Sequence, residues 1–452
     1  MADDFTFANV RRAVTGIARY VRAQRPSGGR VVVGRDPRFL GELLVQMAGD
    51  ILAQHGITPL VIADPAPTPA IAHYVRTQKT DGAINFTASH NPPEYNGIKF
   101  STPDGAPALP EVTRAIEAEI ARLPGDAAPS TAKAAHAEAI DVRAGYLDRL
   151  RELVQFGVMR EAGLRVVFDP LWGAARGYAD EVLRAESIEC ATVHDTRDVL
   201  FGNHAPEPDD ALLETLRVKM RESSAQIGIA TDGDADRFGV VDGDGAFVQP
   251  NYVTALLFDY LVETRGWKNG VAKSVATSNL INALAEHHGV KLYETPVGFK
   301  FIGELIDHDA IAIGGEESAG LSIRHHVPEK DGIIAGLLCC EMVARRGASL
   351  SAQLQKIFDT VGSFYPRREN FRLTPEVKQK FTTKTTTEPG DFFGRAVRQV
   401  VRTDGLKLVL EDGSWVCYRM SGTEPVVRIY SEARSESDLE RLSADAKRWV
   451  FE

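Results

Sequence analysis

Residues 227–237 read IGIATDGDADR, a short apolar run that passes directly into three aspartates at alternate positions. The apolar run predicts a buried strand, and the polar, Gly-containing sequence after it predicts a loop at the end of that strand. Two other segments share this design, since Ala83–Phe86 leads into TASHNPP and Ala310–Ile313 leads into GGEESAG. Ligands of α/β folds gather at strand ends, so we expect the three loops to face one cleft.

Each of these three strands is the last one of a recurring unit. The units begin with short apolar runs at Val31–Val33, Val166–Phe168 and Val271–Val275. A segment with helical spacing follows in each unit, and then a second apolar run, at Thr58–Ile62, Ile188–Val193 and Val290–Tyr293. Strands that alternate with helices predict α/β domains with largely parallel sheets.

Two breaks in this pattern suggest domain boundaries. Residues 124–139 are rich in Ala, Pro and Ser and predict an exposed linker, and the pattern changes again near residues 362–368. The segment after the second break contains two predicted strands, Trp415–Arg419 and Val426–Tyr430. We therefore expect an α/β fold of three related domains and a smaller C-terminal α+β domain, at residues 1–140, 141–246, 247–362 and 363–452.

The composition is that of a folded globular protein, with 44% hydrophobic and 25% charged residues among 452. Lys and Arg number 52 against 62 Asp and Glu, and the net charge of −10 opposes a large nucleic-acid-binding surface. No apolar stretch reaches the roughly 20 residues of a membrane helix, and residues 1–20 lack the apolar region of a secretory signal. The four cysteines lack metal-ligand spacing and are expected to be free thiols. We expect a cytoplasmic protein without nucleic-acid or membrane partners, whose oligomeric state the sequence leaves open.

The three aspartates Asp232, Asp234 and Asp236 predict a metal site. Side chains two residues apart on an extended backbone point the same way, and three converging carboxylates need a cation to neutralise them. Mg²⁺ is a hard ion that prefers such oxygen ligands. An EF-hand is excluded because its sixth position would be Arg237 rather than Gly and its twelfth would be Gly243 rather than Glu. An acidic surface turn is the alternative interpretation.

Ser89 lies in the segment TASHNPP, in which two prolines cannot continue a strand ladder. The serine is therefore expected on a stiff, exposed bend, where its hydroxyl could act as a nucleophile or carry a phosphoryl group. A turn residue that makes local hydrogen bonds is the ordinary alternative. No GxSxG sequence surrounds the serine, which argues against the triad of an α/β-hydrolase.

Two further loops offer groups suited to a sugar phosphate. The loop after Gly314-Gly315 offers acceptors and a hydroxyl from Glu316, Glu317 and Ser318, although a helix cap would explain it equally. The loop in YRMSGTEPVVRIY offers an anion-binding set made of Arg419, Ser421, Gly422 and Thr423. An ordinary turn between strands explains this second loop equally well.

Isolated basic residues have two interpretations as well. Lys99 and Lys300 could reach phosphate oxygens, yet a single lysine is ordinarily solvated. Arg35 and Arg38 in GRDPR have a surface ion pair with Asp36 as their ordinary explanation.

Together, the motifs resemble those of the α-D-phosphohexomutase family, which includes phosphoglucomutases and phosphomannomutases. They follow the family's order along nearly the whole chain, as GRDPR, TASHNPPEYNGIKF, DGDADRFG, TPVGFKFI, GGEESAG and RMSGTEPVVRIY. The resemblance implies three related α/β domains around a central cleft and a smaller C-terminal α+β domain. GEESAG is similar to the loops of glucose-type mutases, so glucose phosphates are expected first and mannose phosphates second.

The resemblance also implies a role for each motif. Ser89 would be the phosphorylated serine, and the Mg²⁺ ligands would be Ser89, Asp232, Asp234 and Asp236. Arg237 would support the phosphoserine loop, and either His90 or Lys99 would transfer protons or stabilise charge. Substrate would be bound by Lys300, Glu316, Ser318, Arg419, Ser421, Gly422 and Thr423.

The implied reaction interconverts hexose 1-phosphate and hexose 6-phosphate. Phosphoserine transfers its phosphoryl group to the sugar, the hexose 1,6-bisphosphate turns over, and a second transfer regenerates the phosphoserine. Hexose 1,6-bisphosphate is also the expected activator, and sugar phosphates are the expected partners.

The start of the chain differs from the family pattern. Family members usually begin with a strand and an FGTxGWRG-like segment, whereas this chain begins MADDFTFANV, which resembles the sequence just after that segment. The expected consequences are an exposed sheet edge and one arginine fewer at the phosphoserine. A second hypothesis is therefore a catalytically impaired sugar-phosphate-binding protein. A third is a metal-dependent sugar phosphatase, since leakage of water into the site would turn transfer into hydrolysis.

Overall fold

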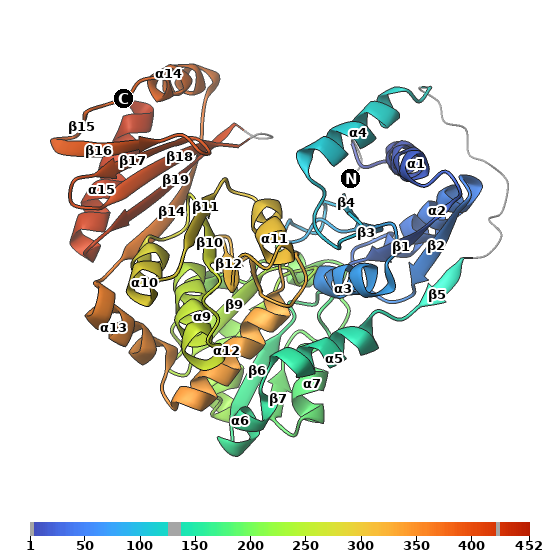
Figure 1. Cartoon of the computed structure of the whole chain (residues 1–452), viewed down its shortest axis with the longest axis horizontal. Coiled ribbons are helices and arrows are strands. Elements are labelled where there is room, and N and C mark those ends of the chain that lie inside the picture. Colours follow the sequence, from blue (N-terminus) through green and yellow to red (C-terminus); the bar gives the residue numbers. More distant parts are fainter. Residues whose placement is uncertain (1–3, 125–136, 422–424) are drawn as a thin grey trace.

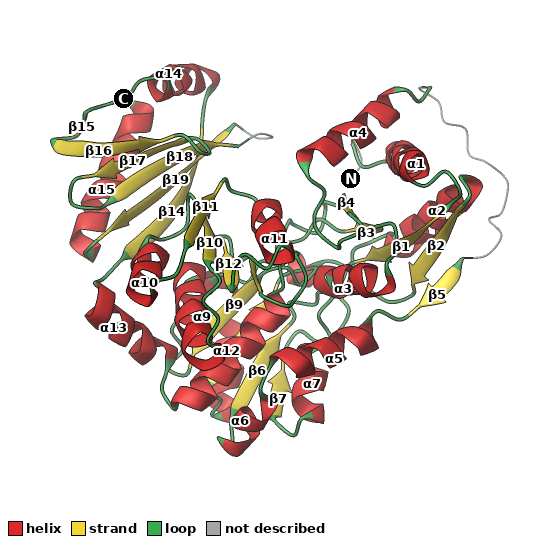
Figure 2. Cartoon of the chain, in the orientation of Figure 1, coloured by secondary structure: helices red, strands yellow, loops and turns green. Residues whose placement is uncertain are grey.

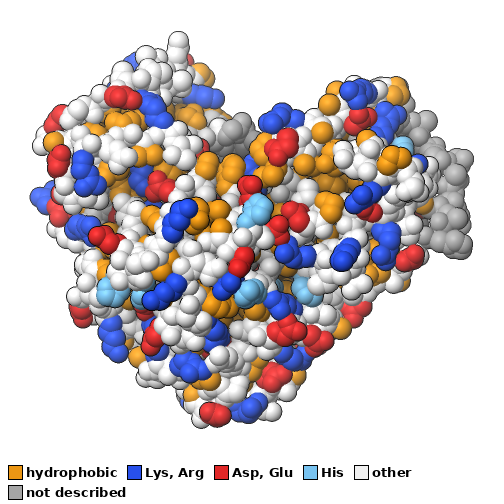
Figure 3. Space-filling view, in the orientation of Figure 1, with side chains coloured by type: hydrophobic (Ala, Val, Ile, Leu, Met, Phe, Trp, Pro, Cys, Tyr) orange, Lys and Arg blue, Asp and Glu red, His pale blue; other side chains and the backbone are white. Residues whose placement is uncertain are grey.

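The computed structural model describes residues 4–124, 137–421 and 425–452. Their strands form four sheets, and we refer to the parts built on these sheets, in chain order, as domains I to IV. Domains I and IV form two lobes, and domains II and III join them (Figure 1). Helices flank the sheets of the first three domains (Figure 2). The space-filling view shows a notch between the two lobes (Figure 3).

Domains I, II and III share one sheet topology. In each of them the first strand lies between the second and the third and is parallel to both, and the fourth strand is antiparallel to the third. Domain I has the order β4-β3-β1-β2-β5, with β1 Gly29–Arg35, β2 Ile57–Ile62, β3 Ala83–Phe86, β4 Ile98–Ser101 and β5 Glu138–Ile140. Domain II has the order β7-β6-β8-β9, with β6 Arg165–Asp169, β7 Glu189–Thr192, β8 Ile227–Thr231 and β9 Phe238–Asp242. Domain III has the order β11-β10-β12-β13, with β10 Val271–Ser274, β11 Leu292–Thr295, β12 Ile313–Gly315 and β13 Leu321–Ile323.

The helices that accompany these sheets lie between successive strands, apart from α1, which precedes β1. Those of domain I are α1 Phe7–Gln24, α2 Gly41–Gln54, α3 Thr68–Gln78 and α4 Pro110–Ala121. Between β5 and β9 lie α5 Arg143–Leu153, α6 Phe156–Glu161, α7 Ala179–Ala185, α8 Glu214–Ser223 and the 3₁₀ turns η1 Phe201–Asn203 and η2 Asp210–Leu212. Those of domain III are α9 Pro250–Arg265, α10 Leu280–His288, α11 Phe299–Asp307, α12 Gly332–Arg346 and α13 Leu350–Val361.

Domain IV is built on an antiparallel sheet of the order β14-β19-β18-β17-β16-β15. Its strands are β14 Tyr365–Arg372, β15 Asp391–Phe392, β16 Arg395–Val401, β17 Leu406–Leu410, β18 Trp415–Met420 and β19 Val426–Ala433. Its helices are α14 Pro375–Thr385 and α15 Glu436–Phe451. The predicted fold class, three related α/β domains followed by a smaller C-terminal domain, is confirmed.

Some elements differ from the sequence prediction. The third strand of domain III, β12, begins at Ile313 rather than Ala310, so Gly314 and Gly315 belong to the strand and not to the loop. The second strand of domain III begins at Leu292 rather than Val290. The end of the predicted linker forms β5, which pairs with β2, while residues 125–136 lie outside the described residues. The boundaries at residues 140, 246 and 362 stay predictions.

Buried apolar side chains tie domains II and III together more closely than domains III and IV. One hydrophobic cluster extends through domains I, II and III, whereas domain IV has a core of its own. Helix α12 explains this continuity, because residues 332–343 are all buried and the helix packs on β8, β9 and α6 of domain II as well as on α9. Domain IV meets domain III through a small cluster made of Ala276, Val409, Trp415, Cys417 and Tyr430.

Two further expectations concern single features of the chain. The four cysteines are free thiols, as predicted, and Cys190 is the one that is not fully buried. Among the described residues, no helix has the length and apolar character needed to cross a membrane.

Candidate active site

The aspartates of DGDADR lie in a tight turn between β8 and β9. All three side chains are completely buried, and one oxygen of each carboxylate lies within 4.8 Å of the others. The predicted convergence is therefore found, but its predicted cause is wrong. Residues 232–237 are not extended, and Ala235 has a left-handed backbone with φ of 61°, so the turn itself brings the carboxylates together.

Backbone hydrogen bonds attach this turn to three domains. The carbonyl oxygen of Asp234 accepts from the Thr68 N–H at the start of α3, at 2.9 Å. The carbonyl oxygens of Gly233 and Ala235 accept from Ala174 of domain II and Gly332 of domain III, at 2.9 and 3.0 Å. The metal-binding candidates are thus fixed by the frame of domains I to III rather than by one flexible loop.

Ser89 meets this turn from domain I. Its Oγ donates to Asp232 Oδ2 at 2.6 Å and lies 3.5 Å from Asp236 Oδ1. The two loops approach so closely that a Cβ on Gly233 would lie 2.6 Å from the Ser89 carbonyl oxygen. Ser89 is 8% exposed, so the expected exposed bend is in fact a buried one. Its backbone is left-handed, with φ of 51°, which is uncommon for a residue other than glycine and marks a constrained position.

Arg38 holds the loop that carries Ser89. Its Nη2 donates to the carbonyl oxygens of Ser89 and Asn91, at 2.8 and 2.6 Å, and its Nη1 donates to those of Pro92 and Tyr95, at 2.8 and 3.0 Å. Its Nε donates to Asp36 Oδ2 at 2.9 Å. The surface ion pair that was the alternative for GRDPR is therefore wrong, since both side chains are buried. Arg38 instead fixes four carbonyl groups between residues 89 and 95.

Two lysines face the aspartates from other elements. Lys99 Nζ on β4 donates to Asp234 Oδ2 at 2.7 Å and to Asp236 Oδ2 at 2.8 Å, and Lys330 also donates to Asp236. Burial alone would lower the pKa of Lys99, but the carboxylates of Asp234 and Asp236 raise its pKa well above the usual value. Sequence reasoning missed Lys330. The one available signal was its position just before Asp331, which caps α12.

The aspartate cluster has the chemistry of a divalent-cation site. Its oxygens belong to three carboxylates and a serine hydroxyl, and Asp234 Oδ1 is buried without a hydrogen-bond partner among the described residues. Burial, and next the carboxylates of Asp236 and Asp234, raise the pKa of Asp232 well above its usual value. A cation would relieve that repulsion and use the unpaired oxygen, so these residues could hold a metal ion.

His90 and Arg237 make different contacts around Ser89 and Asp232. His90 Nδ1 lies 3.3 Å from Ser89 Oγ, and burial, followed by the charge of Arg237, lowers the pKa of His90 to about 3. The backbone N–H of Arg237 donates to Asp232 Oδ1 at 3.0 Å, whereas its guanidinium donates to Glu207 Oε1 at 3.1 Å. The predicted support of the serine loop by Arg237 stays a prediction.

The loop of GGEESAG that follows β12 turns back into β13 and contacts the turn that carries the three aspartates. The N–H of Phe238 donates to the Ala319 carbonyl oxygen at 3.3 Å. Glu316 is 4% exposed, and its Oε1 accepts from the Gly298 N–H at 2.7 Å. Burial, and next the neighbouring Glu317, raise the pKa of Glu316 to about 7.

Ser318 and Lys300 accompany this loop. Ser318 lies in the same turn, and Lys300 lies at the start of α11 with its Nζ 5.2 Å from the Phe301 ring centroid. The structure thus places Glu316 and Ser318 beside the aspartate turn. The sugar-binding roles of all three residues stay predictions.

The anion-binding set of domain IV is described in part. Gly422 and Thr423 lie outside the described residues, and Ser421 donates its N–H to the Val426 carbonyl oxygen at 2.8 Å. Arg419 on β18 lies directly opposite Arg428 on β19. Two like charges in such a pair repel each other unless an anion lies between them. Sequence reasoning did not single out Arg428, which the register of β18 and β19 places on the same face as Arg419.

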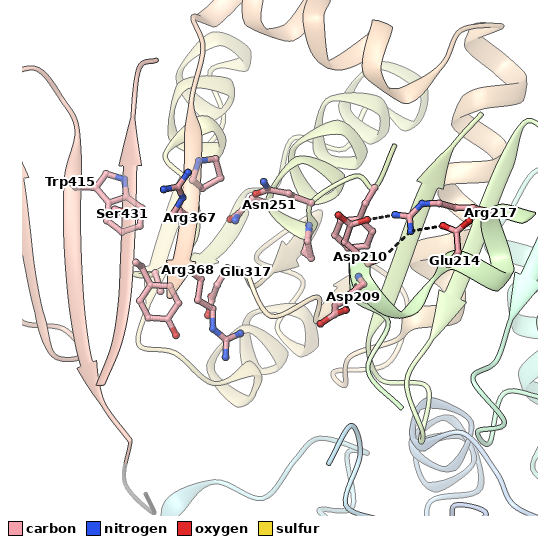
Figure 4. A pocket seen from close by; sticks show the side chains of 17 residues that line it. Asp209, Asp210, Glu214, Arg217, Asn251, Glu317, Arg367, Arg368, Trp415 and Ser431 are labelled. Atoms are coloured by element: carbon pink, nitrogen blue, oxygen red, sulfur yellow. Dashed lines mark hydrogen bonds and ion pairs between the residues drawn. The ribbon is translucent and has the colours of Figure 1, made fainter. Parts of the chain in front are cut away.

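A cavity of about 800 Å³ opens between domains II, III and IV. Arg367 and Arg368 line one wall, and Asp209 and Asp210 line the opposite wall (Figure 4). Glu317 of the GGEESAG loop also lines it. The cavity therefore borders the loop that is predicted to bind the sugar, although Ser89 does not line it.

Four family models match the chain in sequence. They describe domains I, II and III and the C-terminal domain of phosphoglucomutase/phosphomannomutase, and they match residues 1–124, 144–245, 249–361 and 376–448. The chain belongs to the phosphoglucomutase/phosphomannomutase family. It is thus an enzyme of the isomerase class, and the resemblance to the α-D-phosphohexomutases is confirmed.

Individual members of the phosphoglucomutase/phosphomannomutase family cover nearly the whole chain. A phosphoglucosamine mutase of Thermobifida fusca is 31% identical over 94% of this chain and 89% of its own length. A phosphoglucomutase of Komagataeibacter xylinus is 29% identical over 93% of this chain and 83% of its own length. The crystal structure of a protein assigned as a phosphomannomutase, from Thermus thermophilus, has a TM-score of 0.86 and 32% identity, with 99% of this chain and 96% of that chain covered.

Proposed function

We propose that this phosphohexomutase interconverts glucose 1-phosphate and glucose 6-phosphate, with mannose phosphates as second substrates, through phosphorylated Ser89 and Mg²⁺. The observation that carries the proposal is the 2.6 Å contact between Ser89 Oγ and Asp232 Oδ2 inside a buried cluster of three carboxylates. A serine hydroxyl held beside a metal-binding set is the arrangement that a phosphoserine donor needs.

Charge neutralisation is the first task of the residues around Ser89. A phosphoserine has a charge of about −1.5 to −2, so it repels the three aspartates unless positive charge offsets both. Bound Mg²⁺ would supply part of that charge and polarise the phosphoryl oxygens. Lys99 and Lys330 add fixed positive charge from the chain itself, since both are ion-paired with Asp236. Lys99 is therefore suited to stabilising charge, and His90 and Lys99 both stay candidates for proton transfer.

Positioning is the second task, and it belongs to the other domains. We infer that Glu316 and Ser318 accept and donate hydrogen bonds to sugar hydroxyls, while Arg419 with Ser421, Gly422 and Thr423 binds the phosphate that does not react. The phosphoryl group of Ser89 passes to the free hydroxyl, and the resulting hexose 1,6-bisphosphate, which is also the activator, turns over before the second transfer. Burial of Ser89 supports this scheme, because water at the phosphoserine would turn transfer into hydrolysis.

The choice of glucose rests on the loop sequence GEESAG, which is similar to the loops of glucose-type mutases. The names of the relatives divide between glucose, mannose and glucosamine phosphates, so the sugar must be measured. The proposed location in the cytoplasm rests on the cysteines, whose free thiols fit a reducing compartment.

The test is a coupled assay of purified protein with glucose 1-phosphate, Mg²⁺ and a trace of glucose 1,6-bisphosphate. We expect glucose 6-phosphate to form, and to form faster than the products from mannose or N-acetylglucosamine phosphates. Ser89→Ala should abolish the reaction, and persistent turnover in that variant would overturn the assignment of Ser89. Release of free phosphate in step with substrate loss would identify a phosphatase, and binding without turnover would identify an impaired binding protein.

A further inference from the structure

The turn between β16 and β17 connects domain IV to domain III through one carboxylate. Asp404 lies in this turn, and its Oδ2 pairs with Arg419 Nη2 at 2.8 Å and accepts from the Val297 N–H at 3.0 Å. The turn depends on Gly405, which has φ of 87° and where a Cβ would lie 2.1 Å from the Tyr418 carbonyl oxygen. A single oxygen atom thus links the arginine of the anion-binding set to the backbone of domain III.

The next backbone amide of domain III is bound by a second acid. The N–H of Gly298 donates to Glu316 Oε1 at 2.7 Å, one residue after the N–H that Asp404 accepts. The side chain of Val297 packs against the apolar cluster between domains III and IV. The two successive amides therefore form a short connection from Arg419 through Asp404 to Glu316.

Asp404 also balances the positive charge around Arg419. Arg419 lies opposite Arg428, and Asp404 is the acid that pairs with Arg419 among the described residues. Burial lowers the pKa of Arg419, but the hydrogen bonds and charges of Asp404 and Tyr430 together outweigh burial and raise its pKa overall. The Nε of Arg419 is buried and has no partner in the part of the chain that the structure describes, so it stays available to an anion. Asp404 holds the guanidinium in place without occupying that donor.

We propose that Asp404 is a positioning residue that sets the distance between the phosphate-binding arginine and the sugar-binding loop. It acts through Arg419 and Glu316 and does not touch substrate itself. This inference rests on the proposed function, because it assigns the ligand held at both ends as a hexose monophosphate. A ligand that spans both groups needs the connection, whereas inorganic phosphate needs only the anion-binding set.

The experiment compares binding of glucose 6-phosphate and inorganic phosphate by calorimetry to the wild-type chain, Asp404→Ala, Asp404→Asn and a control. The control is Asp412→Ala in the next turn of the same sheet, where Asp412 accepts from the Ser414 N–H at 2.9 Å. We expect Asp404→Ala to weaken glucose 6-phosphate binding about tenfold to hundredfold, as loss of a charged hydrogen bond does. Binding of inorganic phosphate should stay the same or tighten, because an acid near the anion is removed. Asp404→Asn keeps an acceptor for Val297 and should restore most of the lost affinity.

Equal weakening of both ligands by Asp404→Ala would overturn the proposal, since it would mean that the anion loop had collapsed. Affinities like those of the Asp412→Ala control would overturn it too. If the wild-type chain binds glucose 6-phosphate but does not isomerise it, the proposed function is wrong. The comparison of affinities still tests the role of Asp404 in that case. If the wild-type chain does not bind the sugar phosphate at all, both proposals fail.

Discussion

At the scale of single residues, the three buried carboxylates differ in their partners. Asp234 Oδ2 accepts from Lys99 Nζ at 2.7 Å and from Thr68 Oγ1 at 2.6 Å, while its Oδ1 has no partner among the described residues. Asp236 faces two lysines, and their charges, with that of Arg237, outweigh the effect of burial and lower the pKa of Asp236. The unpaired oxygen therefore makes Asp234 the carboxylate whose loss should affect a metal ion most specifically.

Asp234→Asn tests the metal site. The amide keeps the volume and one acceptor oxygen but removes a charge that the cation needs, so we expect Mg²⁺ affinity to fall by at least about 100-fold. The measurement is a titration of activity with Mg²⁺. Asp244→Asn is the matched control, because Asp244 is an exposed residue after β9 that accepts from the Ala246 N–H at 2.9 Å. Identical Mg²⁺ curves for the two variants would contradict the assignment of Asp234.

Glu316 makes stability depend on pH in a direction that can be worked out. Burial raises the pKa of Glu316 from 4.5 to about 7, so the folded state binds its proton more tightly than the unfolded state. Its contribution to stability is full below pH 4.5 and is lost as the pH rises through 7. Glu316→Gln removes this dependence, and the variant should gain about 1 to 3 kcal/mol relative to wild type between about pH 5 and pH 8. Urea unfolding at both pH values measures the difference in unfolding free energy between the variant and wild type. The same difference at both pH values would contradict the predicted pH dependence.

At the scale of elements, the loop from Ser89 to Tyr95 has its conformation imposed by β1 and the residues after it. Thr87 Oγ1 donates to Asp36 Oδ2 at 2.7 Å and accepts from the Ser89 N–H at 2.9 Å, and Arg38 binds the carbonyl groups of the loop. The Arg38 guanidinium also lies 5.0 Å from the ring centroid of Phe201 in domain II. The left-handed Ser89 is therefore held from several directions at once.

Arg38→Ala should disorder this loop. It leaves Asp36 buried without its ion-pair partner and removes the donors of four carbonyl groups, so we expect a loss of about 3–5 kcal/mol in unfolding free energy. Turnover should fall further than stability explains, because Ser89 loses its position. Arg25→Ala is the control, since the exposed pair of Arg25 with Asp81 should contribute less than about 1 kcal/mol. Denaturant unfolding and turnover rates measure the two effects. Similar values for both variants would contradict the role of Arg38 in fixing the loop from Ser89 to Tyr95.

The sequence predicts these elements unevenly, for physical reasons. The strands before the three loops are predicted because their apolar runs are buried on both faces, as β3 and β8 are. The role of Arg38 is not predictable, because its acceptors lie more than 50 residues later in the chain. The same holds for Lys330, which reaches Asp236 from another domain. Local patterns reveal which loops carry chemistry, whereas the partners of each side chain depend on how the domains pack.

At the scale of the whole molecule, domain IV is attached to the other three domains by a small, specific contact. The Trp415 Nε1 donates to Glu432 Oε1 at 2.7 Å, and that carboxylate accepts from the Asn279 N–H of domain III at 2.9 Å. Lys407 adds a hydrogen bond to the Val275 carbonyl oxygen at 2.8 Å. The position of the anion-binding set relative to Ser89 depends on this contact, because the core of domain IV is separate.

Trp415→Ala should detach domain IV without unfolding domains I to III. Removing this 1% exposed side chain leaves a cavity and takes one of the hydrogen-bond donors from Glu432, so we expect the unfolding free energy to fall by about 3–5 kcal/mol. Small-angle scattering should show a larger radius of gyration, and turnover should fall as the anion-binding set moves away. Trp449→Ala is the control, because Trp449 packs on Tyr418 and Phe381 within domain IV. An unchanged scattering profile for Trp415→Ala would contradict this account of the attachment.

The most direct test of the central claim, a phosphoryl group carried by Ser89 against the aspartate cluster, is the intact mass of the protein after incubation with glucose 1,6-bisphosphate and Mg²⁺. We predict one adduct of about 80 Da, the increment of a single phosphorylation, which peptide mapping places on Ser89 and which excess glucose 1-phosphate removes. Ser89→Ala should acquire no adduct. An adduct on another residue, or one that persists in Ser89→Ala, would contradict the claim.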